Sequence, residues 1–304
     1  MTKQFASSLP AKFINNVTGL CGAKGALWLE ELPAVIASLE SEWSISAGAN
    51  FPALSYNYVA PATTAAGDAA VLKIGLPTED TEIFGESKYL SILDGCGCPC
   101  RISESRERRA ILIERVTPGR TLREQFAGRE DDALPVLIRM IDRTTASIPD
   151  DTADLIKLDD WFDGLLRAVG TSFSKRHTER AFRYYSEMSE SAPNRLLHGD
   201  LHHENILTAT REPYLAIDPK AIIGPIGYEI AVFLNNHLWW MEWKPDAAAS
   251  LGRAVDMYAE AFAMSSRDIR QWAFCQMVLG TWWSFDEMNE DFSEGLGFAD
   301  MWNV

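Results

Sequence analysis

Apolar residues recur three and four positions apart through most of the chain after residue 122, and this spacing is typical of helices that bury one face. Polar breaks divide the region into separate helices. The pattern predicts helices over residues 130–147, 155–169, 174–190, 229–241, 245–263 and 266–290.

The first part of the chain has a mixed pattern. Apolar positions around residues 32–39 predict a helix within residues 1–42, with Pro33 in its first turn, where proline is tolerated. Short runs of apolar and β-branched residues further on are typical of strands. They predict strands over residues 43–45, 53–59, 68–74 and 110–116, and a helix over residues 79–93.

Pro118-Gly119 is the turn-forming break between the strand at 110–116 and the long helical region. Such a break between segments of different pattern marks a boundary between compact units. We therefore divide the chain into a first lobe, residues 1–116, and a second lobe, residues 117–304.

The composition is that of a globular protein with a sizeable core, because hydrophobic residues make up 47% of the 304 positions. The net charge is −15, which disfavours nucleic acid as a partner, since nucleic-acid binders carry basic patches. The same charge fits a cationic small molecule, although acidic proteins also gain solubility in this way.

Nothing in the pattern predicts a membrane partner or export. The most apolar region, residues 221–240, is interrupted by Glu229, Asn235, Asn236 and His237. The N-terminus has no apolar run of signal-peptide length, and five cysteines do not fit a secreted disulfide framework. We expect a cytoplasmic location.

The clearest chemistry lies in H-G-D-L-H-H-E-N at residues 198–205, followed by I-D-P-K at residues 217–220. Asp200 and Asn205 stand five positions apart, the spacing of the catalytic loop of kinases. Asp218 follows a second apolar run, which fits a short hairpin that returns another carboxylate to the same place. A carboxylate beside a hydroxyl, with an amide and a carboxylate on magnesium, is sufficient equipment for phosphoryl transfer.

These motifs resemble the aminoglycoside phosphotransferases and related small-molecule kinases, most of all the streptomycin and hydroxyurea phosphotransferases. The resemblance implies an α/β, protein-kinase-like fold of two lobes: a small nucleotide-binding lobe with an antiparallel sheet, and a larger, mainly helical lobe for catalysis and substrate. It also implies ATP or GTP with Mg. Asp200 would act as the base or orient the acceptor hydroxyl, and Asn205 and Asp218 would hold Mg.

The strand at residues 68–74 resembles the V-A-I-K strand of kinases, so Lys73 would pair the α- and β-phosphates. A single lysine in an apolar strand otherwise marks a strand end or a side chain that reaches to solvent. Glu86 matches the family's E-x-x-x-L and would hold Lys73 by an ion pair. Glu82, one turn earlier, is the alternative, and both acids would otherwise be solvated helix residues.

Two further segments are assigned to the nucleotide by the resemblance. Residues 46–50 would lie over the phosphates, although Gly48 is the single glycine there and an ordinary hairpin fits equally well. Residues 110–122 resemble the family's L-L-E-R-x-x-P-G-x-x-L, the hinge between lobes. Main-chain groups from Glu114 to Val116 would then bind the adenine edge.

Two residues are expected to support the catalytic loop. His198 would pack beneath it and hold the backbone of Asp200. Residues 227–231 resemble the family's Y-D-L-A, in which an aspartate steadies the loop backbone. This chain has Glu229 there, one methylene longer, which leaves the local geometry open.

Two clusters raise the alternative of a transition metal. Cys96, Cys98 and Cys100 stand at every second position, whereas structural zinc takes four ligands, usually in C-x₂₋₄-C pairs. The resemblance places these cysteines in a turn between a helix and a strand. Three histidines lie within residues 198–203, but magnesium prefers oxygen ligands, and we favour magnesium.

In the family that the chain resembles, substrates lie against C-terminal helices that carry acids. Here Asp286 and Glu287 follow Trp282, with Glu290 close behind. We expect these acids to bind a cationic, hydroxyl-bearing small molecule, with a cation–π contact from Trp282. The alternative is a solvated acidic helix end.

We therefore expect a kinase that transfers the γ-phosphate of a nucleotide to a hydroxyl of a streptomycin-like antibiotic. A kinase of a small metabolite, such as choline, homoserine or a sugar derivative, is the alternative. A binding protein that keeps the fold without turnover is a third hypothesis, which the intact Asp200, Asn205 and Asp218 oppose. No pattern in the sequence indicates an oligomeric state.

Overall fold

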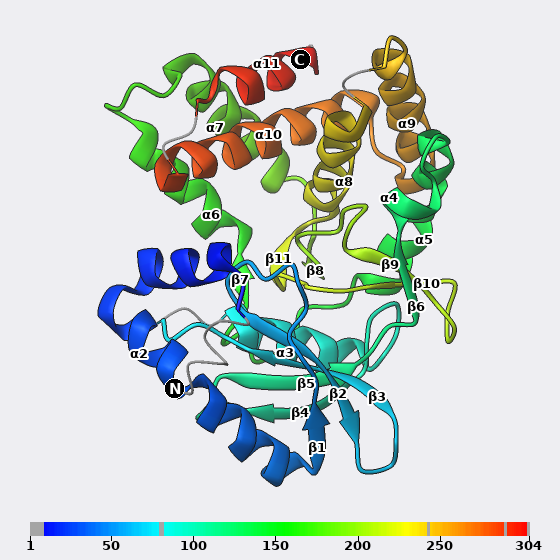
Figure 1. Ribbon diagram of the computed structural model, residues 1–304. Helices are drawn as coiled ribbons and strands as arrows, with labels where there is room; N and C mark the ends of the chain where they lie inside the picture. The colour runs from blue at the N-terminus through cyan, green and yellow to red at the C-terminus, as the bar shows by residue number, and fades with distance from the viewer. Residues whose placement is uncertain (1–8, 79–81, 242–243, 289–290, 303–304) are drawn as a thin grey trace. The chain divides into compact units, whose positions relative to one another are not determined.

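The computed structural model describes residues 9–78, 82–241, 244–288 and 291–302. The chain forms two compact units, Met1–Val116 and Thr117–Val304, and each has its own hydrophobic core (Figure 1). The functional assignment of the two units stays a prediction. No helix in the described ranges is both long enough and apolar enough to cross a membrane.

The first unit is built on one antiparallel sheet with the strand order β1-β2-β3-β5-β4. Alternate residues of a strand face opposite sides, so the two faces of β3 have different neighbours. Leu72 and Ile74 belong to the core shared with helix α2, whereas Lys73 faces helix α3. The elements are α2 (Ala11–Trp43), β1 (Ile45–Ala47), β2 (Tyr58–Thr64), β3 (Ala69–Ile74), α3 (Glu82–Leu93), β4 (Arg101–Ser105) and β5 (Ala110–Glu114).

Helix α2 differs from the prediction. It begins at Ala11 and is interrupted by Gly22, whose φ of 55° is not helical. Pro33 therefore lies inside the helix and not in its first turn. A proline there removes a hydrogen bond, but the face that carries Leu32 and Leu39 is fully buried in the core of the first unit, and this packing retains the helix.

The strand predicted over residues 53–59 is wrong in its position. Strand β2 covers Tyr58–Thr64. The strand predicted over residues 43–45 is also displaced: Trp43 ends α2, and β1 covers Ile45–Ala47. Pro61 lies inside β2 and signals a strand break in the sequence. The strand forms because Tyr58, Ala60 and Ala62 alternate into the core.

The second unit is mainly helical, as predicted. Its longest helix is α10, which packs against α7, α8, α9 and α11, and Trp272 and Trp282 of α10 are buried in its core (Figure 1). The helix α11 was not predicted. The helices, including the 3₁₀ helices η1 and η2, are α4 (Leu122–Gln125), η1 (Glu130–Ala133), α5 (Leu134–Thr144), α6 (Leu158–Gly164), η2 (Leu165–Ala168), α7 (Lys175–Ser189), α8 (Ile226–Met241), α9 (Ala247–Phe262), α10 (Ser266–Met288) and α11 (Ser293–Met301).

Two small sheets in the second unit hold the segment that carries Asp200 and Asn205. Their strand orders are β10-β9-β6 and β7-β11-β8. The loop at residues 198–205 runs from β8 in one sheet to β9 in the other, so both of its ends are fixed. The strands are β6 (Pro118–Thr121), β7 (Ile156–Lys157), β8 (Asn194–Leu197), β9 (Ile206–Ala209), β10 (Tyr214–Ala216) and β11 (Ile222–Pro225).

Candidate active site

The predicted hairpin is present and brings the two metal-ligand candidates to the same end. Strands β9 and β10 are antiparallel, with Ala216 opposite Ile206. One step further, the Ile217 N–H donates to the Asn205 carbonyl oxygen at 2.8 Å. Asp218 therefore follows directly after the residue that is bonded to Asn205.

His198 joins the catalytic loop to the segment around Asp218. Its Nε2 donates to the Ile217 carbonyl at 2.9 Å, so its Nδ1 accepts the Asp200 N–H at 3.3 Å. Its own carbonyl accepts the Lys220 N–H at 2.7 Å. Burial lowers the pKa of His198 to about 4, which keeps the ring neutral and preserves this pattern of bonds. The expected support of the Asp200 backbone by His198 is confirmed.

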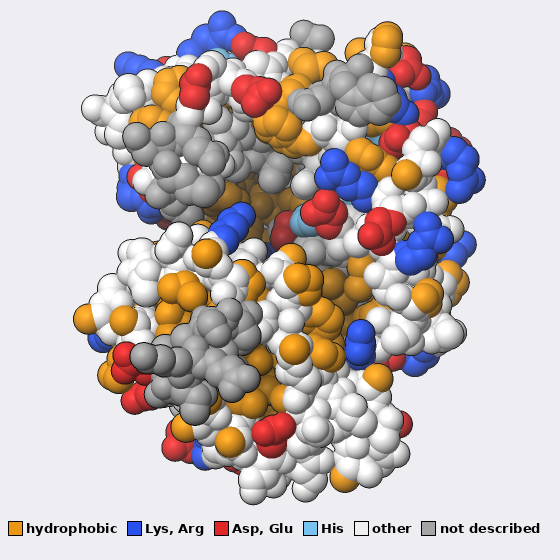
Figure 2. All heavy atoms as spheres, viewed as in Figure 1, with side chains coloured by type: hydrophobic (Ala, Val, Ile, Leu, Met, Phe, Trp, Pro, Cys, Tyr) orange, Lys and Arg blue, Asp and Glu red, His pale blue; other side chains and the backbone are white. Residues whose placement is uncertain are grey.

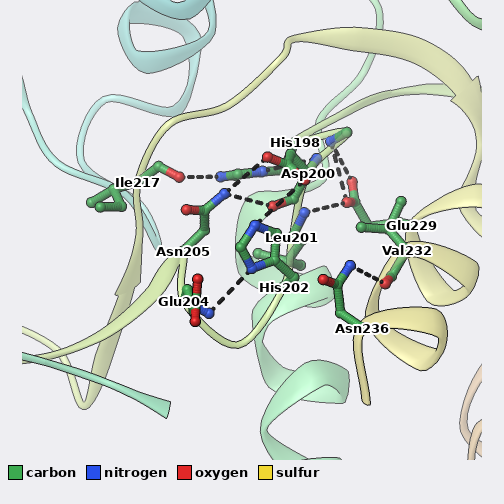
Figure 3. Close-up of polar contacts among 11 residues, drawn as sticks. His198, Asp200, Leu201, His202, Glu204, Asn205, Ile217, Glu229, Val232 and Asn236 are labelled. Atoms are coloured by element: carbon green, nitrogen blue, oxygen red, sulfur yellow. Dashed lines mark hydrogen bonds and ion pairs between the residues drawn. The ribbon is translucent and has the colours of Figure 1, made fainter. Parts of the chain in front are cut away.

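Glu229, at the start of α8, holds the loop backbone on the other side of Asp200 (Figure 3). Its carboxylate accepts the Gly199 N–H at 2.9 Å and the Leu201 N–H at 3.2 Å. Burial raises the pKa of Glu229 to about 7, and the two backbone N–H groups oppose this rise by favouring the charged form. The additional methylene thus does not prevent Glu229 from supporting the loop.

Gly199 is required by the backbone of this loop. Its φ is 83°, in the left-handed region, and a Cβ atom there would lie 2.3 Å from the Ile222 side chain. The backbone of Gly199 therefore lies so close to Ile222 of β11 that a side chain has no room. The local backbone geometry therefore explains why the sequence motif has a glycine at position 199.

Asp200 lies between Asn205 and His202 (Figure 3). Asn205 Nδ2 donates to the Asp200 carbonyl oxygen at 2.9 Å and to Asp200 Oδ2 at 3.1 Å. The other carboxylate oxygen, Oδ1, is 3.6 Å from His202 Nε2. Although burial lowers the pKa of His202, the nearby Asp200, Glu204 and Asp218 carboxylates raise it overall. The Asp200 carboxylate is thus fixed in orientation by its neighbours.

The donor atoms near Asp200 suit magnesium. Because Asn205 uses its amide nitrogen on Asp200, its oxygen is the end of the amide left for a cation. The half-buried Asp218 adds carboxylate oxygen, and its φ of 61° is a conformation that aspartate tolerates more readily than most residues. Oxygen atoms are the ligands that Mg²⁺ prefers. Within the described ranges, no group of three or more His, Cys, Asp and Glu side chains is arranged for a metal ion.

In the first unit, Lys73 and Glu86 form the ion pair that we expected. Lys73 Nζ is 2.5 Å from Glu86 Oε2, and the two residues are only 7% and 3% exposed. The strand β3 presents Lys73 and the helix α3 presents Glu86. The partner of Lys73 is thus Glu86, as expected, and not the alternative, Glu82.

The other nucleotide residues have simpler surroundings. Gly48 follows β1 directly, and its N–H donates to the Pro61 carbonyl at 2.8 Å. The Glu114 N–H donates to the Cys100 carbonyl at 2.8 Å, inside the sheet. The Arg115 N–H likewise donates to the Ala69 carbonyl at 3.2 Å, so both of these N–H groups are used inside the sheet, and Val116 follows them along the chain. The predicted roles of Gly48, Glu114 and Val116 stay predictions.

The cysteines lie in the expected turn. Residues 94–100 join α3 to β4, and residues 94–98 form turns and bends. Cys98 is buried, and Cys96 and Cys100 are half-buried.

The proposed substrate role of Trp282 is wrong for this conformation. Its side chain is 1% exposed and packs edge-on against Phe173 with a centroid distance of 5.4 Å, so no aromatic face is open to a cation. Asp286 is paired with Arg167 at 2.8 Å, and a substrate cation would have to displace that arginine. The side chain of Glu287 and all of Glu290 lie outside the described residues. Helical periodicity alone does not distinguish a core tryptophan from a ligand-binding one.

Sequence reasoning missed a cavity beside the catalytic loop. It is lined by residues 202–204 of the loop, by Asn236, Trp239 and Trp240 of α8, and by Arg123 of α4. The sequence feature that could have indicated this cavity is the pair Trp239-Trp240, which follows Asn235-Asn236 on a mainly apolar helix. Around α4, α8 and α9, Figure 2 shows basic side chains among acidic ones, so the negative net charge is not gathered there into one patch.

Comparison with known proteins agrees with this site. A family model described as aminoglycoside/hydroxyurea antibiotic resistance kinase matches residues 42–287. A streptomycin 6-kinase of Streptomyces griseus is 26% identical over 273 residues, which cover 88% of this chain and 87% of that protein. A hydroxyurea phosphotransferase of Kitasatospora aureofaciens is also 26% identical, over 92% of this chain and 81% of its own length.

The fold has relatives among solved structures. Amicoumacin kinase, solved with AMP-PNP, Ca²⁺ and Ami, superposes with a TM-score of 0.60 at 17% identity and covers 90% of this chain and 96% of its own. At this identity the likeness shows the fold alone. The expected kinase-like fold, with an antiparallel sheet in one unit and helices in the other, is confirmed.

Proposed function

The chain belongs to the aminoglycoside/hydroxyurea antibiotic resistance kinase family, and we propose that it transfers the γ-phosphoryl group of ATP to a hydroxyl of a streptomycin-like antibiotic. It is a phosphotransferase with an alcohol group as acceptor. The observation that carries the proposal is the arrangement of Asp200, Asn205 and Asp218 at one end of the β9–β10 hairpin.

Each residue has a role that its surroundings support. Asp200, held in orientation by Asn205, would accept the hydrogen bond of the acceptor hydroxyl and take its proton as the oxygen attacks. Asn205 and Asp218 would hold Mg, which supplies charge neutralisation at the phosphates when bound. Lys73, kept extended by Glu86, would bind phosphate oxygens. Gly48 would lie near the phosphates, and Glu114 and Val116 would meet the adenine edge.

The acceptor is inferred from relatives. Two relatives are streptomycin 6-kinases, and another is a hydroxyurea phosphotransferase. Hydroxyurea is therefore the second candidate acceptor. Both candidates are small molecules with a hydroxyl group and several N–H donors.

A coupled assay of ADP release over a panel of acceptors tests the proposal. The panel contains streptomycin, hydroxyurea, choline and neutral sugars, with ATP and GTP compared as donors. We expect the highest kcat/KM for streptomycin with ATP. Turnover of choline alone would replace the proposal with a metabolite kinase, and no stimulation by any acceptor would oppose the kinase assignment.

A further inference from the structure

The cavity beside the catalytic loop contains about 140 Å³ of space. Whole drug-sized ligands occupy pockets of about 300–1,000 Å³, so this cavity suits one group of a larger molecule. It lies entirely within the second unit. Its lining includes Glu204, four residues after the catalytic Asp200.

Asn236 offers an acceptor to this cavity. Its amide nitrogen donates to the Val232 carbonyl of the same helix at 2.9 Å (Figure 3). The amide oxygen is therefore the end that remains for a ligand. An acceptor of this kind pairs with an N–H or O–H group.

His203 offers a second acceptor, and the reason lies in a chain of hydrogen bonds behind it. The Ser250 hydroxyl donates to Asp131, so Ser250 Oγ is left to accept from His237 Nε2, at 3.5 Å. His237 Nδ1 then lacks a proton and accepts from His203 Nε2 at 3.2 Å. In the neutral ring, His203 Nδ1 is consequently an unprotonated acceptor.

That nitrogen has no hydrogen-bond partner among the described residues. His203 is 3% exposed, and its ring packs against Phe233 and Trp240. A buried polar atom without a partner costs about 1–3 kcal/mol of free energy. His203 lines the cavity, and because its Nδ1 is itself buried, a ligand reaches this nitrogen when the side chains around it move.

Glu204 completes a set of acceptors at the mouth of the cavity. Its carboxylate pairs with Arg123 at 3.0 Å, and both side chains are more than half exposed. Such a pair is weak and can exchange partners. A ligand cation would take the place of the Arg123 guanidinium.

Trp239 gives the cavity an aromatic wall. It is 40% exposed, in contrast to the buried Trp282, and it is held by an edge-on contact with Phe298 at 4.3 Å. A planar cation stacks on such a face with a further gain of about 0.5–2 kcal/mol. An exposed, fixed tryptophan beside carboxylate and amide acceptors is typical of a cation site.

We propose that this cavity is the specificity subsite for the acceptor, and that it binds one planar, N–H-donating cation such as a guanidinium group. His203, Glu204 and Asn236 accept its hydrogen bonds, and Trp239 covers its face. Arg123 competes with the ligand for Glu204. That the bound cation belongs to the acceptor rests on the proposed function. Binding of a cation in the cavity can be tested without turnover.

The first experiment uses methylguanidinium as the probe and tetramethylammonium as its control. Both carry one charge, but only the first has N–H donors. Indole N–H resonances of the ¹⁵N-labelled protein, assigned with Trp239→Phe and Trp240→Phe, report binding at equal ionic strength. We expect methylguanidinium to shift both resonances with an affinity at least about tenfold higher than tetramethylammonium. Equal shifts, or none, would overturn the proposal.

The second experiment compares two neutralisations with streptomycin as acceptor. Glu204→Gln removes the counter-ion and should raise KM about three- to tenfold, with kcat nearly unchanged, because the group binds ground and transition states alike. Arg123→Gln removes the competitor and should lower KM about twofold or more. Glu212→Gln, in the turn between β9 and β10 and paired with Arg143, is the matched control and should leave KM unchanged.

Opposite signs for Arg123→Gln and Glu204→Gln support the subsite. Changes of the same sign, or an unchanged KM in both, would overturn it while streptomycin turnover upholds the kinase. If no acceptor is phosphorylated but methylguanidinium still shifts the Trp239 resonance, the proposed function fails and the cation site stands.

Discussion

Replacement of Glu229 by glutamine tests how the catalytic loop is held. Glu229 Oε2 accepts the Gly199 N–H at 2.9 Å, and Oε1 accepts the Gly199 and Leu201 N–H groups at 3.2 Å. Glutamine has the same size but only one oxygen. In either orientation its NH₂ group faces the Gly199 N–H, donor against donor, and is itself a buried donor without an acceptor.

The magnitude follows from that unpaired donor. A buried donor without an acceptor costs about 1–3 kcal/mol. If the loop moves to relieve this cost, Asp200 leaves the position set by its own N–H bond to His198. A loss of about 1–3 kcal/mol in transition-state stabilisation corresponds to a decrease in kcat of roughly 5- to 150-fold. Glu229→Asp should also lower kcat, because its carboxylate is withdrawn by about one C–C bond, ~1.5 Å.

The assay measures kcat and KM for streptomycin together with the urea midpoint of unfolding. Glu130→Gln is the matched control, since Glu130 is also a buried glutamate that accepts a backbone N–H, from Gly128 at 3.0 Å. Glu130→Gln should lower stability without a comparable loss of kcat. Nucleotide affinity should be unchanged in Glu229→Gln, because the lesion lies at the acceptor carboxylate.

A folded Glu229→Gln protein with wild-type kcat would refute the reasoning. In that case the N–H bonds to Gly199 and Leu201 would not control the position of Asp200. Equal losses of kcat in Glu229→Gln and Glu130→Gln would refute it as well, since the effect would then follow stability alone.

Three further predictions concern the same unit. Asp200→Asn should lower kcat about 10²- to 10⁴-fold with little change in nucleotide affinity, measured by coupled assay and nucleotide titration. Activity should require Mg or Mn and be lost in Asp218→Ala, and stoichiometric zinc in the purified protein would contradict the magnesium assignment. Burial lowers the pKa of His198 and His237 to about 4, so unfolded chains take up protons first as the pH falls from 6.5. Each histidine should lower the free energy of unfolding by roughly 1.4 kcal/mol for every pH unit that the pH falls between 6.5 and 4. Glu229 offsets part of this loss, because its raised pKa makes the folded protein more stable as the pH falls from 7 to 4.5. Urea midpoints that stay constant from pH 7 to pH 5 would contradict this.

The catalytic segment could be predicted because its local sequence determines its geometry. Gly199 supplies a conformation and a close approach that other residues lack, and the short hairpin returns Asp218 to Asn205 whatever surrounds it. The helices of the second unit were found for a related reason, since long amphipathic runs retain their period. The Lys73–Glu86 pair could be predicted because the pattern of the strand and a motif in the following helix both pointed to it.

The errors arose where tertiary packing outweighs local pattern. Pro33 and Pro61 indicate breaks, yet each lies inside an element whose core-facing neighbours are buried. Trp282 and Trp239 are both helical tryptophans, and only the packing shows that the first is in the core and the second is exposed. The acceptor state of His203 depends on Ser250 and His237, which are distant in sequence, so no local pattern could reveal it.

The central claim is that Asp200 directs phosphoryl transfer to a hydroxyl of a small antibiotic. The most direct measurement is ³¹P NMR of streptomycin incubated with ATP, Mg and the protein, with Asp200→Asn as the parallel sample. We expect a new phosphate monoester resonance and stoichiometric ADP with the wild-type protein, and almost none over the same time with the variant. A folded, ATP-binding wild-type protein that forms no monoester on streptomycin or hydroxyurea, or a variant that forms it at the wild-type rate, would contradict the account.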